Sequence, residues 1–259
     1  MVDFLLSLTT WLGCSVAMVT TTGAGLVVYL VFVKFISKYK SYDLKDAINN
    51  VFRVVGLLVS LMLALTFSEV ISELKTIRRA VQHEAVAISD VFKALKLFDT
   101  DKTRELRGTL IEYSKAVIND EWLTLADDNL SQRVEALRKQ VVKAVVNLKP
   151  VNSDQKMLRS LIVADLDSLS DYRVIRLNGA QATPPFFMYI IIFGFLVTMA
   201  CFGAYPPQTP LVVLILFYTV FIGLVLYLIL QLSDPFQGDI GVSARPFEYL
   251  VETLQSEIR

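Results

Sequence analysis

The fold is decided by residues 186–232, FFMYIIIFGFLVTMACFGAYPPQTPLVVLILFYTVFIGLVLYLILQL, which contain no Asp, Glu, Lys or Arg. They lie within a longer run of 57 uncharged residues. About 20 apolar residues in a helix cross a hydrocarbon core about 30 Å thick, so this run can cross a membrane twice. The sequence predicts transmembrane helices at about 186–204 and 211–232, joined by a proline-rich turn.

Two further apolar runs precede this stretch. Residues 4–33 are uncharged over 30 positions and predict a first span within 12–36. Residues 54–68 are uncharged over only 15 positions, about 22 Å of helix, which is shorter than the hydrocarbon core. We expect the charges that flank this second span to snorkel, or neighbouring helices to shield it. Because no Gly or Pro interrupts 57–98, the second span is expected to continue as one helix into a polar segment.

The polar segment, residues 69–182, has a different composition. It carries 17 acidic and 18 basic residues among 114. Its apolar residues recur at helical spacing, which predicts a bundle of four helices: the extension of the second span to about 98, then about 101–120, 128–147 and 153–178. Asp and Ser at the breaks are expected to cap the helices that follow. The apolar face of the first helix consists of Val70, Leu74, Ile77, Val81, Ala85, Ile88, Phe92 and Leu95.

The predicted fold class is therefore all-α, an integral membrane protein with a helical bundle inserted between the second and third of four transmembrane helices. Residues 1–68 hold transmembrane helices 1 and 2, 69–182 the extramembrane bundle, 183–232 transmembrane helices 3 and 4, and 233–259 a tail with a short helix. We expect a multi-pass protein of the plasma or inner membrane. Five basic residues at one set of helix ends against six at the other leave the side of the bundle open.

The composition argues against several other functions. The 25 basic and 25 acidic residues form no basic stripe, which argues against nucleic-acid binding. Cys14 and Cys201 both lie in apolar runs and His83 is the one histidine, so the sequence encodes no disulfide framework and no Cys or His metal centre. Phosphate-binding loops, nucleophile elbows and zinc motifs are absent from the sequence. We expect no enzyme, no cofactor and no metal site.

Four short motifs, in this order and spacing, resemble the bestrophin-like domain family: RRAVQHEA at 78–85, Tyr113 followed by Glu121-Trp122, YRVIRL at 172–177, and DPFQG at 234–238. The resemblance covers about 34–247. The family is distantly similar to bestrophins, oligomeric anion channels with four spans and a helical cytosolic domain. The resemblance thus implies an ion channel, and it implies a cytosolic bundle.

The motif residues have two possible roles, structural ones or contacts with anions or lipids. Arg173 and Arg176 lie three apart on one helix face, where they could bind lipid phosphates or other anions. Ion pairs with Glu84 or Asp234 are the favoured alternative. The motif residues that we single out are Arg79, Glu84, Tyr113, Trp122, Arg173, Arg176, Asp234, Pro235, Phe236 and Gly238.

The second span is the predicted pore lining, in a ring of subunits, because four helices are too few to enclose a pathway in one chain. Apolar side chains would form a constriction that gates by dewetting, with polar and acidic rings beyond it. The predicted pore face, in order, is Val55, Val59, Met62, Thr66, Glu69 and Glu73. The small residues Gly56, Ser60 and Ala64 form a ridge suited to packing on a neighbouring helix.

Two alternatives stay open at this point. The apolar residues of the predicted pore face could contact lipid or the bundle, and its glutamates could pair with Lys75 or Arg78. The ion sign is also undecided, because acidic rings favour cations whereas the resemblance implies anions. The sequence thus predicts a homo-oligomeric ion channel whose partners are the lipid bilayer, its own copies and inorganic ions. The alternative function is a non-conducting membrane scaffold or sensor whose helical domain binds a partner.

Overall fold

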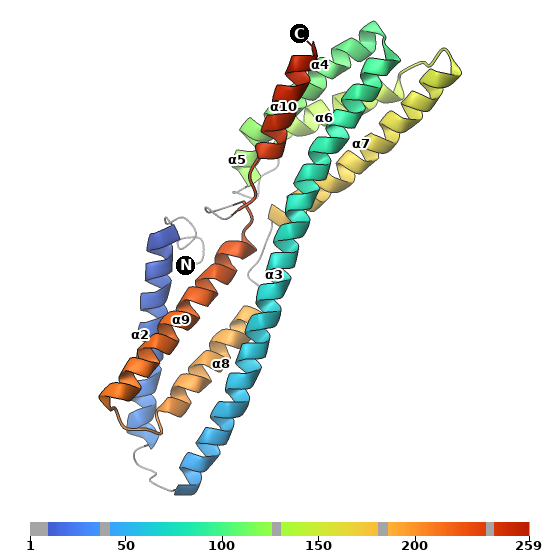
Figure 1. Ribbon diagram of the computed structural model, residues 1–259. Coiled ribbons are helices and arrows are strands. Elements are labelled where there is room, and N and C mark those ends of the chain that lie inside the picture. Colours follow the sequence, from blue (N-terminus) through green and yellow to red (C-terminus); the bar gives the residue numbers. More distant parts are fainter. Residues whose placement is uncertain (1–9, 37–41, 126–130, 181–185, 237–240, 259) are drawn as a thin grey trace. The chain divides into compact units, whose positions relative to one another are not determined.

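The computed structural model describes residues 10–36, 42–125, 131–180, 186–236 and 241–258, and the described regular elements are all helical (Figure 1). The predicted all-α fold class is confirmed. The elements are α2 (Thr10–Ile36), α3 (Tyr42–Phe98), α4 (Asp101–Ala116), the π-helix η1 (Val117–Glu121), α5 (Trp122–Leu125), α6 (Gln132–Val146), α7 (Ser153–Ala180), α8 (Phe186–Phe202), α9 (Thr209–Ser233) and α10 (Arg245–Ile258).

The chain divides into two compact units. Unit 1 comprises residues 1–72 and 183–241, and unit 2 comprises residues 73–182 and 242–259. The predicted tail is thus shared between them, because its helix α10 belongs to unit 2. α3 is one helix of 57 residues that contributes to both units, as the absence of Gly and Pro after Leu57 predicted.

The bundle helices follow the predicted apolar pattern, with two local differences. Every residue of the predicted apolar face of α3 is buried, with an exposed fraction of at most 6%. The expected helix at 101–120 is instead an α-helix that ends at Ala116 and continues as η1 and α5. Aspartates do not make the described caps. Backbone N–H groups donate to the side chains of Thr100, Ser131 and Asn152, whose oxygens cap α4, α6 and α7.

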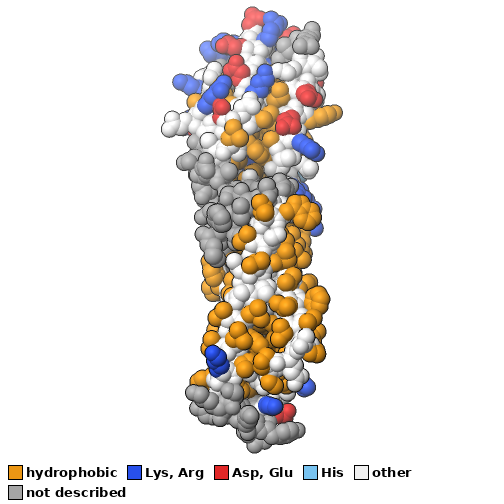
Figure 2. Space-filling model, turned by 90° about the vertical axis from the view of Figure 1, so that its left-hand side faces the viewer, with side chains coloured by type: hydrophobic (Ala, Val, Ile, Leu, Met, Phe, Trp, Pro, Cys, Tyr) orange, Lys and Arg blue, Asp and Glu red, His pale blue; other side chains and the backbone are white. Residues whose placement is uncertain are grey.

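Unit 1 contains the apolar helices. α2, α3 and α9 are long and apolar enough to cross a membrane, whereas α8 is apolar but has 17 residues. The four-span count therefore stays a prediction, although the apolar helices place the chain in a membrane. Figure 2 shows hydrophobic side chains spread over the surface of these helices, where the exposed residues include Val27, Phe193 and Phe217.

Glycines set the distance between the helices of unit 1. α2 packs against α8 and α9 (Figure 1). A Cβ at Gly223 of α9 would lie 3.0 Å from the Cα of Met18 and 3.1 Å from the carbonyl oxygen of Ala17, both backbone atoms of α2. Gly194 of α8 similarly leaves room for the side chain of Val59 of α3. Backbones approach closely where small residues meet, which is how helices associate in membranes.

We predict that Gly223→Ala destabilises unit 1, because the backbone of α2 cannot move away from the new methyl group without separating the helices. Overpacking of this kind costs about 1–3 kcal/mol. The melting temperature of the purified protein in detergent measures the effect. Gly23→Ala is the matched control, since a Cβ there meets nothing within 4 Å. Equal melting temperatures for the two variants would contradict the prediction.

Candidate functional site

The predicted pore face of α3 is divided by the packing of unit 1. Val59 is buried with 7% of its surface exposed, and Thr66 is fully buried. Val55 and Met62 are half-buried, whereas Glu69 and Glu73 are exposed. The apolar part of this face therefore packs within the subunit, because Val59 fills the space left by Gly194.

Another face of α3 is left uncovered by the subunit. Leu57, Leu61 and Leu65 are 72%, 51% and 53% exposed, and Val54 and Ser68 are exposed in line with them at steps of three and four. We call these five residues the exposed stripe. Sequence periodicity could not separate the exposed stripe from the predicted pore face, since both carry apolar residues at helical spacing.

The predicted packing ridge is also uncovered. Gly56 has open space where a Cβ would stand, and Ser60 and Ala64 are exposed. The Ser60 hydroxyl donates to the Gly56 carbonyl at 2.8 Å, so the ridge needs no external polar partner.

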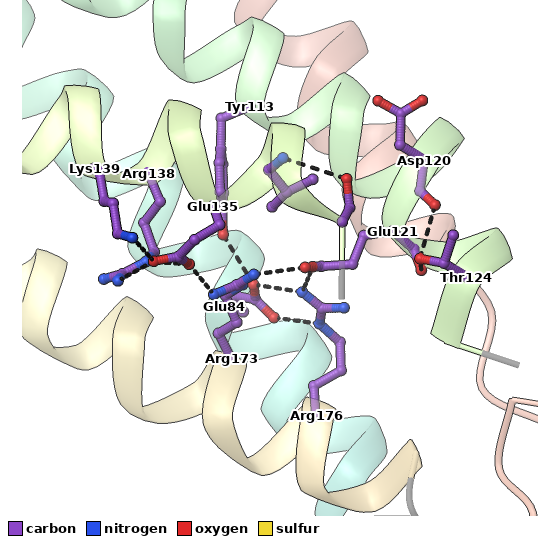
Figure 3. Close-up of polar contacts among 12 residues, drawn as sticks. Glu84, Tyr113, Asp120, Glu121, Thr124, Glu135, Arg138, Lys139, Arg173 and Arg176 are labelled. Carbon is purple, nitrogen blue, oxygen red and sulfur yellow. Dashed lines mark hydrogen bonds and ion pairs between the residues drawn. The ribbon is translucent and has the colours of Figure 1, made fainter. Parts of the chain in front are cut away.

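In unit 2, four motif residues form a buried ionic cluster: Glu84, Glu121, Arg173 and Arg176 (Figure 3). Arg176 donates from Nε to one Glu84 oxygen at 2.7 Å and from Nη2 to the other at 3.1 Å. Glu121 accepts from Nη2 of Arg176 and Nη2 of Arg173, each at 2.6 Å. Two carboxylates thus neutralise two guanidinium groups.

Further polar groups hydrogen-bond to the cluster. Tyr113 donates its hydroxyl proton to Glu84 across 3.4 Å, and Arg173 donates to Glu135 at 2.9 Å. Glu135 also accepts two hydrogen bonds from Arg138 on the same helix. Figure 3 shows these groups converging from α3, α4, η1, α6 and α7.

Aromatic rings cover the remaining side of Arg176. Its guanidinium carbon lies 5.6 Å from the ring centre of Trp122 and 5.8 Å from that of Phe247 on α10. The two rings meet edge to face at 6.1 Å. These cation–π contacts connect the C-terminal helix to the ionic cluster.

The π-helix η1 sets the position of Glu121. A π-helix inserts an extra residue into a helical turn and so rotates the residues that follow it, often at functional sites. Here Glu121 becomes fully buried while its neighbour Asp120 is partly exposed and pairs with Arg133 at 3.1 Å. Glu121 belongs to one of the family motifs but is not among the site residues predicted from the sequence. Its position next to Trp122 in that motif was the one sequence feature that could have identified it as a site residue.

Burial and charge determine the pKa values in the cluster. Burial lowers the pKa of Arg176, but the nearby charge and hydrogen bonds of Glu84 and the charge of Glu121 outweigh burial and raise it. Burial, reinforced by Glu84, raises the pKa of Tyr113 well above its usual value. The hydrogen bonds from Arg138 lower the pKa of Glu135 to about 2. At neutral pH the cluster thus holds charged arginines and a protonated tyrosine.

The remaining motif residues are not members of the cluster. Arg79 is exposed on α3. Asp234 follows the last residue of α9 and accepts the backbone N–H of Phe236 at 3.3 Å, and Pro235 is buried. Glu84 and Asp234 are the two partners predicted for the arginines. Glu84 pairs with Arg176, and Asp234 belongs to unit 1. Gly238 lies outside the described residues.

Comparison with known families shows to which family the chain belongs. The Bestrophin-like domain family matches residues 19–247, most of the chain. The chain belongs to the bestrophin-like family. This bestrophin-like protein contains all of the cluster residues within the matched segment, and its apolar helices make it an integral membrane protein. A search of curated proteins found no match.

Solved structures share the fold. Two mutant forms of a bacterial bestrophin homologue from Klebsiella pneumoniae superpose with TM-scores of 0.63 and 0.62 at 14% and 13% identity, covering 93% and 95% of this bestrophin-like chain and 97% of each homologue. A structure described as a membrane protein gives 0.60 at 15% identity, over 95% of this chain and 96% of that one. At this level of identity the comparison establishes the fold.

We predict that Glu84→Gln strongly destabilises unit 2 of this bestrophin-like protein. It leaves the guanidinium of Arg176 buried without its main counter-charge, and breaking a buried ion pair costs about 3–5 kcal/mol. Chemical unfolding followed by circular dichroism measures the loss. Glu257→Gln, which removes a partly exposed pair with Lys96, is the control and should cost less than about 1 kcal/mol. A comparable loss in both variants would contradict a special role for the cluster.

We predict a pH-dependent effect of Glu135→Gln. The pKa of Glu135 is lowered from 4.5 to about 2 in the folded protein, so its ionised form stabilises the fold above the unfolded pKa. The stability difference between wild type and variant should be full above about pH 5 and should disappear as pH falls towards 2. Melting temperatures across this range test it, with Glu112→Gln, at an exposed position of α4, as the control. A difference independent of pH would contradict the prediction.

Proposed function

We propose that this chain forms a homo-oligomeric ion channel whose pore is lined by the first half of α3. The observation that carries the proposal is the exposed stripe, a row of mostly apolar side chains left uncovered on a helix of a bestrophin-like membrane protein. The family membership and the fold shared with a bacterial bestrophin homologue support a channel-type protein.

Burial supports the exposed stripe as the pore constriction. A residue that lines a pore must be free of its own subunit's packing, and Val59 and Thr66 are not. Leu57, Leu61 and Leu65 are free, and a ring of such side chains around an axis would form an apolar constriction that excludes water. Glu69, exposed four residues after Leu65, would then add an acidic ring.

A ring of subunits follows from the same surface. Unit 1 contributes four described apolar helices, and α2 packs against α8 and against α9 within the subunit. A pathway lined by α3 therefore needs α3 helices from several copies. The uncovered leucines would otherwise face lipid.

We predict that Leu61→Ser raises ion flux through liposomes that contain the purified protein, because a polar side chain hydrates an apolar constriction. Met62→Ser places the same polar side chain on the predicted pore face, so comparing the two variants distinguishes which face of α3 lines the pore. Leu214→Ser, at a 63% exposed position of α9, is the control for a lipid-facing residue. A change in flux with Met62→Ser alone would move the lining to the predicted pore face.

The sign of the conducted ion is tested in the same liposomes by the reversal potential in a salt gradient. Glu69→Gln removes one acidic group per subunit and should shift the reversal potential towards anions if Glu69 faces the pathway. The absence of flux from wild type and from every α3 variant would instead favour the non-conducting scaffold or sensor.

A further inference from the structure

A groove of about 460 Å³ lies on unit 1 between α3 and the pair α8 and α9. Gly56 and Ser60 lie along its α3 side, and Phe202 and Phe221 lie on the opposite side. Arg53 is the one charged residue in its described lining. A Cβ at Gly56 would meet no atom within 4 Å, so the groove stays open along this helix.

The length of the groove fits one leaflet of a membrane. Arg53 directly precedes the uncharged run of α3, which places it at the boundary of the hydrocarbon core. Leu63, the lining residue of α3 farthest from Arg53, lies ten residues further, about 15 Å along a helix. That is about half of a hydrocarbon core of about 30 Å. An acyl chain anchored at Arg53 would therefore reach the bilayer midplane beside Leu63.

The charges at this end of the helices favour an anion from outside the chain. Within residues 34–53, the described basic residues are Lys34, Lys45 and Arg53, and the described acidic residues are Asp43 and Asp46. Residues 198–222, on the opposite side, contain no charged residue. Arg53 is exposed, and it forms no ion pair with the residues that the structure describes. A second copy would bring the same basic excess to this level, whereas a phospholipid brings a phosphate.

We propose that this groove binds one phospholipid, with its phosphate on Arg53 and an acyl chain along Gly56 and Ser60. Gly56 and Ser60 then contact lipid instead of the neighbouring helix that the ridge predicted, while Ala64 lies outside the lining. The lipid site is independent of ion conduction and would exist in a non-conducting protein.

The test is native mass spectrometry of the full-length protein after reconstitution with phosphatidylglycerol and extraction into mild detergent. We expect wild type to retain one lipid per subunit and Gly56→Leu, which fills the groove, to retain none. Arg53→Gln should weaken lipid retention about fivefold, because one basic residue near a membrane surface strengthens binding to anionic lipid by about that factor. Lys45→Gln, which removes an exposed basic residue of α3 outside the groove, should retain the lipid.

Two results would overturn the proposal. Undiminished lipid retention in Gly56→Leu would show that the bound lipid lies elsewhere. A Gly56→Leu variant that separates into monomers, together with covalent dimers formed through Ser60→Cys in a Cys14→Ala, Cys201→Ala background, would show that a second copy fills the groove. Arg53→Gln keeps the test valid if the larger side chain at position 56 prevents folding.

Discussion

The buried ionic cluster of unit 2 is the constraint on which the rest of that unit depends. Two guanidinium groups removed from water need two carboxylates at hydrogen-bonding distance, because an unpaired buried charge costs several kcal/mol. The partners come from α3, η1 and α7, and Trp122 and Phe247 add contacts from α5 and α10. The helices of unit 2 can therefore pack in few other ways without leaving a charge unsatisfied.

Unit 1 is held by a different kind of interaction. Its helices carry few charges, so shape decides how they pack, and glycines such as Gly25 and Gly223 let α2 approach α8 and α9. Lipid is as apolar as a leucine side chain, so such contacts stabilise by close packing more than by exclusion of water. Surfaces that this packing leaves open, the exposed stripe and the groove at Arg53, are where other molecules can bind.

The two units are joined covalently by α3, by the α7–α8 connection and by the α9–α10 connection. α3 carries the exposed stripe in its first half and Glu84 in its second, and α9 is followed by the helix that places Phe247 on Arg176. In a channel of this architecture, the proposed pore helix would carry one residue of the buried cluster. The last apolar helix would be followed by the helix that contacts the same cluster.

The sequence alone determined the membrane location, the helical bundle and the buried face of α3, because these depend on local composition and on a period of 3.6 residues. It also brought the arginines and Glu84 to attention through the family motifs. Tertiary structure decided the remainder. Glu121 enters the cluster through a π-helix, Phe247 reaches it from the tail, and Val59 is buried because Gly194 makes room for it. None of these contacts is local in sequence, and so no periodicity could have shown which apolar face of α3 packs within the subunit and which is left for a pore or a lipid.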